Sequence, residues 1–126
     1  MKKLFILALP LIMGVACTAQ QTPEDVNSAQ ATELMQSDEV VVLDVRTQEE
    51  WDKGHIEGAQ HMDFYKDDFD NKLAELPKDK EYVVYCHSGG RSAKTVAKMK
   101  QAGFEKVHNL QGGITAWKSE GNETVE

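Results

Sequence analysis

Short apolar runs along the chain predict strands that alternate with helices. Residues 40–45 form a β-branched run without polar alternation, which is typical of a parallel strand buried on both faces. Residues 82–85 predict a second buried strand that leads directly into Cys86, and residues 107–110 predict a third. A shorter strand is expected at residues 59–62.

Segments with helical spacing of apolar residues lie between and around these strands. They predict helices over residues 28–37, 63–76 and 92–102, and a last helix from Gly112-Gly113 through Trp117. Thr47 to Glu50 form a capping-box pattern that opens a short helix directly after the first strand. The helix over 92–102 is amphipathic, with Ala93, Val96, Ala97 and Met99 on one face and Lys94, Lys98 and Gln101 on the other.

The alternation of strands and helices predicts an α/β domain with a central parallel sheet and helices on both faces. In such sheets, ligands bind beyond the carboxyl ends of the strands. Three segments with functional potential follow the expected strands at that edge: Asp44 to Arg46, Cys86 to Arg91, and Gly112-Gly113. We therefore expect the functional site where these segments converge.

Residues 1–17 have the features of a secretory signal. Two lysines precede an apolar run at residues 4–16 that is short for a membrane-spanning helix. A core helix or a permanent membrane anchor is the alternative. The stretch from Gly14 to Cys17 resembles the end of a bacterial lipoprotein signal, in which Cys17 becomes the lipidated first residue. Cleavage after Ala16 or Ala19 without lipidation is the other interpretation, and both predict an exported, periplasmic or cell-envelope protein.

The rest of the chain divides into three parts by composition. Residues 18–27 are polar and predict a tether, residues 28–120 hold one α/β domain, and residues 121–126 form an acidic tail. The formal net charge of −7 gives no electrostatic basis for binding nucleic acid or an anionic lipid surface. We expect a monomer that contacts the membrane by a lipid anchor only, and an anionic substrate would need a local site that works against the overall field.

Cys17 and Cys86 are the two cysteines of the sequence. A disulfide between them is one interpretation, because exported proteins usually use cysteines in this way. It would join a terminal tether to the end of a buried strand. A lone thiol retained at Cys86 for its reactivity is the interpretation that we favour.

The segment from Cys86 to Ser92 joins a buried strand to the start of a helix, where free N–H groups and the helix dipole favour negative charge. Gly89 and Gly90 allow the backbone to curl so that N–H groups point inward, and Arg91 adds a positive charge. Such surroundings lower a thiol pKa and favour the reactive thiolate. An inert, buried cysteine at the end of the strand is the alternative.

At this point the sequence resembles the rhodanese family over essentially the whole predicted domain. The resemblance rests on three motifs in the family's order: Asp44-Val45-Arg46 with Glu50-Trp51 and Gly54-His55-Ile56-Glu57-Gly58-Ala59; the active loop with Cys86, Gly89, Arg91 and Ser92; and Leu110, Gly112, Gly113 and Trp117. His61 and Asp63 depart from residues common in the family.

The resemblance implies a rhodanese-like domain that acts as a sulfurtransferase. The Cys86 thiolate would take a sulfane sulfur from thiosulfate or a persulfide donor and pass it to cyanide or a thiol, without a metal or other cofactor. His87, Ser88, Gly89, Gly90, Arg91 and Ser92 would form the substrate-binding loop. His55, His61, His87 and His108 show no metal-ligand spacing.

Two supporting residues leave alternatives open. Asp44 and Arg46 either contact substrate or form an ion pair that braces the active loop, and the ion pair is the favoured interpretation. His87 either points to solvent or influences the choice of acceptor.

Two rival functions remain. Phosphatases and arsenate reductases also place a cysteine and an arginine in a loop at a helix start, but only four residues separate Cys86 from Arg91, which favours a terminal sulfur over a larger oxyanion. Rhodanese-like domains also serve as non-catalytic binding or sulfur-carrier modules, commonly with the cysteine replaced. The presence of Cys86 favours the enzyme.

Overall fold

A computed structural model describes residue 14 and residues 24–126 of the chain. The predicted signal segment at 1–17, including Cys17, lies outside the described residues except for Gly14, as does most of the predicted tether. No helix among the described residues has the length and apolar character needed to span a membrane.

A five-stranded parallel sheet forms the centre of the domain, with the strand order β1-β5-β4-β2-β3. The strands are β1 (Asp25–Val26), β2 (Val40–Asp44), β3 (Gln60–His61), β4 (Glu81–Tyr85) and β5 (Lys106–Leu110). The helices are α1 (Ser28–Leu34), α2 (Gln48–Asp52), α3 (Phe69–Glu75), α4 (Gly90–Gln101) and α5 (Gly113–Ser119).

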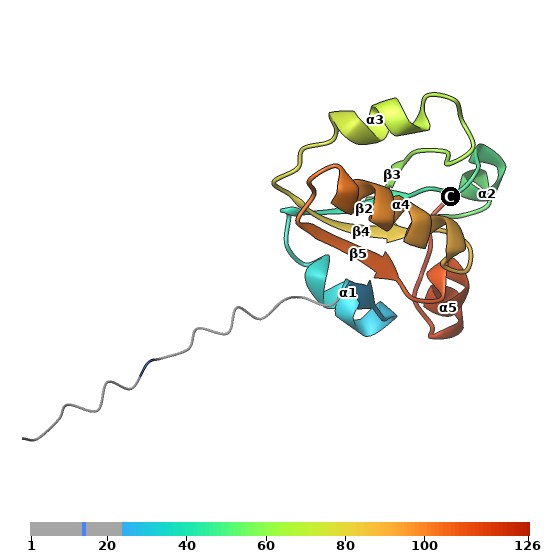
Figure 1. The fold of residues 1–126 in the computed structure, drawn as a ribbon. Helices are drawn as coiled ribbons and strands as arrows, with labels where there is room; N and C mark the ends of the chain where they lie inside the picture. Colours follow the sequence, from blue (N-terminus) through green and yellow to red (C-terminus); the bar gives the residue numbers. More distant parts are fainter. Residues whose placement is uncertain (1–13, 15–23) are drawn as a thin grey trace, which may run out of the picture.

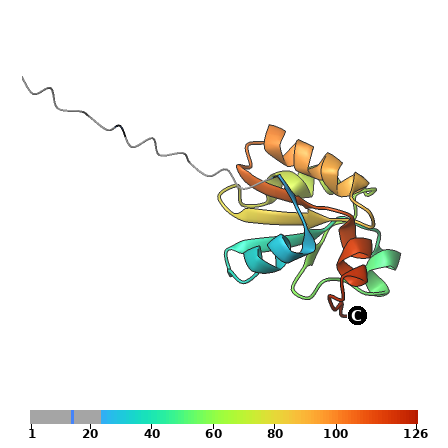
Figure 2. The same cartoon turned by 90° about the horizontal axis from the view of Figure 1, so that it is seen from below.

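Alternate side chains of the central strands pack into two separate hydrophobic cores, one on each face of the sheet. Tyr82 and Val84 of β4 pack with α3 and α4 on one face, and Val83 and Tyr85 pack with α1 and α5 on the other. This follows from the two-residue period of a strand, which sends successive side chains to opposite faces. Helices accordingly cover both faces (Figures 1 and 2), which confirms the predicted α/β class.

Two segments predicted to lie outside the domain pack against it. Asp25 and Val26 fall in the expected tether, yet they form edge strand β1, and Val26 is buried because its side chain joins the core beside α1. At the other end, Val125 in the expected acidic tail exchanges backbone hydrogen bonds of 2.8 Å with His55. Backbone pairing therefore holds both segments, which their polar composition concealed.

The helices begin and end at residues other than those predicted. α1 ends at Leu34 rather than at residue 37, and α3 begins only at Phe69 because turns occupy the preceding residues. In α4, Ser92 and Thr95 are buried with Val96 and Met99, whereas Ala93 and Ala97 are exposed. The predicted apolar face of α4 was therefore wrong by part of a turn, because two hydroxyls that find partners inside replace the two alanines.

Candidate active site

Cys86 follows the last residue of β4 and lies at the carboxyl edge of the sheet, only 1% exposed. Its Sγ accepts a hydrogen bond from the backbone N–H of Gly89 at 3.1 Å, and the hydroxyl oxygen of Ser92 lies 3.3 Å away. Both partners come from the start of α4, so the thiol faces the positive end of a twelve-residue helix.

The pKa of the Cys86 thiol reflects two opposing influences. Burial alone raises this pKa, but hydrogen bonds from the Ser92 hydroxyl and from the N–H groups of Ser92, Gly89 and Ser88 lower it. The hydrogen bonds prevail, and the net pKa is below the ordinary thiol value. The loop therefore favours the thiolate even at a buried position.

Gly89 makes this geometry possible. It caps α4 with a φ of +111°, in a region of backbone conformation that L side chains rarely adopt. The turn brings the Gly89 N–H back onto the sulfur three residues earlier. The inward curl expected of the glycine loop is thus present at Gly89.

The start of helix α5 is hydrogen-bonded to the active loop. The N–H of Ile114 donates to the Cys86 carbonyl at 3.0 Å, and the N–H of Thr115 donates to the His87 carbonyl at 3.2 Å. Gly113 lies so close that an added Cβ would stand 2.5 Å from both carbonyl oxygens. These contacts tie the loop carbonyls to α5 and away from the sulfur, which leaves the loop N–H groups to face it.

Asn109, near the end of β5, is a site residue that the sequence reasoning missed. Its Oδ1 lies 2.6 Å from the hydroxyl oxygen of Ser92, whose single proton is donated either to Asn109 or to the Cys86 thiolate, and its Nδ2 lies 3.5 Å from the Gly89 carbonyl. Asn109 thus contacts both residues that touch the Cys86 sulfur. Its place at the carboxyl end of a predicted strand, just before Leu110 and the glycine pair, was the available signal.

Arg91 pairs with Glu50 of α2. Its two terminal nitrogens donate to the two carboxylate oxygens at 2.7 Å and 3.0 Å. This hydrogen bonding lowers the pKa of Glu50 to about 2 and raises the pKa of Arg91. The sequence placed Arg91 at the site as a positive charge but gave no sign of its partner.

Asp44 and Arg46 form the buried ion pair favoured by the sequence, with 2.7 Å between the Arg46 Nη2 and the Asp44 Oδ2. Arg46 also donates to the carbonyls of Gly54 and Glu50. Its hydrogen bonds therefore hold the segment around α2 in place. They do not run to the Cys86 loop, which Arg46 supports indirectly, through Glu50 and through the ring of Tyr85, whose centroid lies 5.5 Å from its guanidinium carbon.

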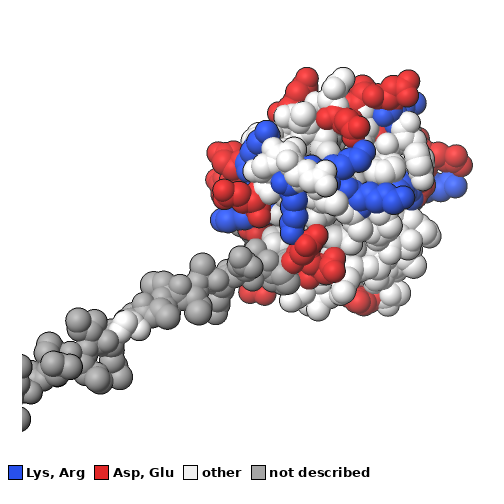
Figure 3. All heavy atoms as spheres, in the orientation of Figure 1, with Lys and Arg blue, Asp and Glu red and all other residues white. Residues whose placement is uncertain are grey.

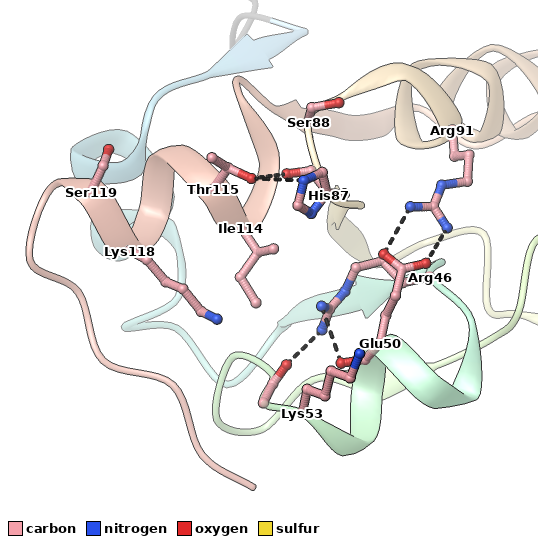
Figure 4. A pocket seen from close by; sticks show the side chains of 11 residues that line it. Arg46, Glu50, Lys53, His87, Ser88, Arg91, Ile114, Thr115, Lys118 and Ser119 are labelled. Atoms are coloured by element: carbon pink, nitrogen blue, oxygen red, sulfur yellow. Dashed lines mark hydrogen bonds and ion pairs between the residues drawn. The ribbon is translucent and has the colours of Figure 1, made fainter.

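A cleft of about 850 Å³ opens beside the active loop (Figure 4). Its lining comes from the loop (His87, Ser88 and Arg91), from the segment around α2 (Arg46, Glu50, Lys53 and Gly54) and from α5 (Ile114, Thr115, Lys118 and Ser119). Cys86 itself is buried, and His87 and Ser88, which follow it, separate its side chain from the cleft.

The histidines lie in separate surroundings. His87 is exposed in the cleft, with its Nε2 3.4 Å from the Thr115 hydroxyl. His55 and His61 both stack on the Trp51 ring, and His108 contacts Glu81 at 2.8 Å. Within residues 24–126, no group of three or more His, Cys, Asp or Glu side chains has the arrangement of a metal site.

The chain is similar in sequence to a known domain family and to proteins named as sulfurtransferases. The profile of the rhodanese-like domain family matches residues 27–120. A probable adenylyltransferase/sulfurtransferase, MoeZ of Mycobacterium tuberculosis, is 45% identical over 78 residues, which are 62% of this chain and only 20% of that protein's length. A sulfurtransferase of Allochromatium vinosum is 36% identical over 88 residues, 70% of this chain and 80% of that protein.

A solved structure has the same fold. The rhodanese-related protein from Thermoplasma volcanium superimposes with a TM-score of 0.72 and 32% identity, covering 82% of this chain and 98% of that one.

Proposed function

The chain belongs to the family of rhodanese-like domains, and we propose that it is a sulfurtransferase that carries a sulfane sulfur on Cys86. The observation that carries this proposal is the pair of contacts on the Cys86 sulfur, from the Gly89 N–H and the Ser92 hydroxyl. They support a thiolate at a buried position, next to a cleft that His87 and Ser88 help to line.

In the first half of the proposed reaction, the Cys86 thiolate attacks the outer sulfur of thiosulfate. A new S–S bond forms to Sγ, and the S–S bond of thiosulfate breaks with its electron pair passing to sulfite, which leaves. The outer sulfur of the resulting persulfide stands about 2 Å beyond Sγ. That distance moves the reactive atom from the buried position toward the cleft.

In the second half, a thiophilic acceptor attacks the outer sulfur, and Cys86 leaves as the thiolate. With cyanide the product is thiocyanate. The hydrogen bonds that lower the pKa of Cys86 also stabilise it as a leaving group, so the same contacts serve both halves. No residue of the proposed cycle needs a metal ion.

A phosphatase is the rival that shares this loop type, and the Arg91 contact argues against it. Both terminal nitrogens of Arg91 are engaged by Glu50, so the guanidinium is not directed at a tetrahedral oxyanion above Cys86. A non-catalytic carrier or binding module is the second rival, and it differs from the enzyme only in turnover.

One assay separates the three functions. Purified protein is supplied with thiosulfate and cyanide, and thiocyanate is measured; in parallel, phosphate release from an aryl phosphate is measured. We expect catalytic thiocyanate formation that Cys86→Ser abolishes, and no phosphate release. A single stoichiometric yield of thiocyanate would indicate a carrier, and phosphate release alone would indicate the phosphatase.

We also propose that the protein is exported and anchored to the cell envelope through a lipid on Cys17. The support for this is the sequence alone: two lysines, an apolar run and the cysteine that follows it. The donor and acceptor would then be small molecules outside the cytoplasmic membrane.

A further inference from the structure

The hydroxyl of Ser92 has one proton and two neighbouring acceptors. Its oxygen lies 3.3 Å from the Cys86 sulfur and 2.6 Å from the Oδ1 of Asn109. A serine hydroxyl donates a single hydrogen bond, although it can accept two. Ser92 is fully buried and Asn109 nearly so, which keeps bulk water away from the hydroxyl. The sulfur and the amide oxygen therefore compete for the same proton.

The orientation of the Asn109 amide follows from its other neighbours. Its Nδ2 lies 3.5 Å from the Gly89 carbonyl oxygen and 3.5 Å from the Asp25 carboxylate, two groups that only accept hydrogen bonds. A flipped amide would direct Oδ1 at these oxygens, which would repel it. Oδ1 therefore faces Ser92, where it acts as an acceptor.

The charge on the Cys86 sulfur decides which acceptor receives the proton. Hydrogen bonds to charged groups are roughly twice as strong as those between neutral groups, so a thiolate draws the Ser92 proton to itself. A neutral sulfur is a weak acceptor, and the proton then turns to the Oδ1 of Asn109. The neutral thiol can also donate its own proton to the Ser92 oxygen, which completes a chain from Cys86 to Asn109.

Charged side chains near the sulfur take no part in this exchange. Arg91 interacts with the thiolate through its charge, but its hydrogen bonds run to Glu50 of α2. From β1, Asp25 contacts the Nδ2 of Asn109 and not the oxygen that faces Ser92. Figure 3 shows lysines and acidic side chains over the surface of the domain, whereas Ser92 and Asn109 are buried. The exchange is one between buried neutral groups and the sulfur.

We infer that Asn109 is a positioning residue that holds the Ser92 proton while the Cys86 sulfur is neutral, releases it to the thiolate, and thereby favours the sulfur-loaded state; this rests on the function proposed above. During loading, the thiolate attacks the outer sulfur of thiosulfate, and sulfite leaves with the electron pair of the broken S–S bond. The negative charge moves from Sγ to the outer sulfur, so the Ser92 proton turns to Asn109. When an acceptor removes the outer sulfur, Cys86 becomes a thiolate again and the proton returns to it.

Asn109→Val removes the competing acceptor. Valine suits a strand, and the Gly89 carbonyl keeps the hydrogen bond that it accepts from the Ala93 N–H. The thiolate would then hold the Ser92 proton without competition. Iodoacetamide labelling of the peptide that contains Cys86, measured below the midpoint of its pH profile, should therefore be about threefold faster than in wild type. A loosened loop would slow labelling instead, because the hydrogen bonds that stabilise the thiolate would weaken.

Two further comparisons show whether this effect passes through Ser92. In a Ser92→Ala background, Asn109→Val should leave the labelling rate unchanged, because the hydroxyl for which Asn109 competes is gone. Asp25→Asn is the matched control, since it removes the charge beside Nδ2 and leaves the Oδ1 of Asn109 in place; it should label as wild type does. If Asn109→Val does not fold, Asn109→Ala takes its place with the same expected results.

The balance between empty and loaded protein is measured in mixtures of thiosulfate and sulfite at a fixed ratio, at a pH where empty Cys86 is a thiolate. The intact mass gives the ratio of persulfide to empty protein. Asn109→Val should lower this ratio about threefold, because it lacks the acceptor that Ser92 uses in the loaded state. Asp25→Asn should keep the wild-type ratio.

Slower labelling of Asn109→Val, or an equal effect of this substitution in the Ser92→Ala background, would overturn the inference and make Asn109 a structural support of the loop. An unchanged ratio of persulfide to empty protein would overturn its role in loading. If thiosulfate gives wild type no sulfur that cyanide can remove, the proposed function is wrong and the loading role falls with it. The labelling comparison still decides in that case whether Asn109 and the sulfur compete for the Ser92 proton.

Discussion

Arg91 donates hydrogen bonds of 2.7 Å and 3.0 Å to the carboxylate of Glu50, although 41 positions separate the two residues. This ion pair joins the start of α4, next to Cys86, to α2 on the other side of the cleft. The pKa of the thiol is lowered by hydrogen bonds from Ser92, Gly89 and Ser88. The pair is therefore a structural brace of the site.

The ion pair between Arg91 and Glu50 makes the free energy of unfolding decrease as the pH falls. Arg91 lowers the pKa of Glu50 to about 2 from an ordinary 4.5. The pair therefore stabilises the folded protein above about pH 4.5, and this contribution is lost as the pH falls toward 2. Glu50→Gln retains an amide that can complete the helix cap but lacks the charge.

We expect Glu50→Gln to lower the free energy of unfolding by about 1–2 kcal/mol at pH 7, since the partly exposed pair is screened by solvent. Urea unfolding at pH 7 and pH 3 measures this difference. It should shrink by about half or more at pH 3. An equal difference at both pH values would show that the Glu50 charge is not its cause.

Ser92 is predicted to control the ionisation of Cys86. Ser92→Ala removes the hydroxyl 3.3 Å from the sulfur, so the pKa of the thiol should rise and its alkylation at pH 7 should slow. A lost hydrogen bond to a charged group costs about 1.5 kcal/mol, which corresponds to roughly tenfold in rate. Iodoacetamide labelling of the peptide that contains Cys86, followed across pH, provides the measurement.

Thr95→Val is the matched control for that substitution. Thr95 is also buried on α4, but its hydroxyl donates to the Arg91 carbonyl at 2.9 Å and not to the sulfur. Its pH profile for Cys86 labelling should match wild type. If Ser92→Ala and Thr95→Val shift the profile alike, the effect belongs to the helix as a whole.

Gly113→Ala tests the support that α5 gives to the active loop. An added Cβ would meet the carbonyl oxygens of Cys86 and His87 at 2.5 Å, at a residue with a φ of +59°. Gly58→Ala is the control, because Gly58 has a φ of +80° but no atom within 4 Å of an added Cβ. Both pay about 1 kcal/mol for backbone strain, and Gly113→Ala should lose about 2 kcal/mol more through overpacking.

Denaturant unfolding measures the loss of stability in each of the two variants. The amount of sulfur that each variant takes up from thiosulfate measures the effect on function. Gly113→Ala should load poorly because the loop carbonyls must move, while Gly58→Ala should load as wild type does. Similar losses of stability and equal loading in the two variants would contradict the role assigned to α5.

Much of this architecture was predictable from local sequence. The β-branched runs in β2 and β4 predicted the central strands of a parallel sheet, and Gly89 and Gly113 mark the places where the backbone turns within or packs closely against the active loop. The place of Cys86 at the carboxyl edge followed from its position directly after a predicted strand of a parallel sheet. Those features depend on neighbours in the chain.

The features that the sequence did not predict, which are the partners of Arg91 and Ser92 and the edge strand β1, depend on contacts between residues far apart in the chain. The Arg91 carboxylate partner lies on α2, the Ser92 hydroxyl partner Asn109 lies on β5, and the strand at Val26 exists because β5 accepts it. No pattern in the sequence near Arg91 or Ser92 identifies these partners. The edge strand is two residues long, too short for periodicity to reveal.

The proposed lipid anchor has its own test. Wild type expressed in full length should fractionate with membranes and carry lipid at Cys17. Cys17→Ala should be found as soluble exported protein or remain unprocessed. Wild-type protein that is soluble outside the cytoplasm, with an unmodified N-terminus after Ala19, would refute the anchor and leave the enzyme proposal unaffected.

The mass of the intact protein after treatment with thiosulfate tests the central claim most directly. We predict a gain of one sulfur atom, located on the peptide that contains Cys86 and removed by cyanide with release of thiocyanate. Cys86→Ser should gain nothing while it keeps its melting temperature within a few degrees, because the change in side-chain volume is small. A folded Cys86→Ser protein that still gains the sulfur and turns over thiosulfate would contradict the account.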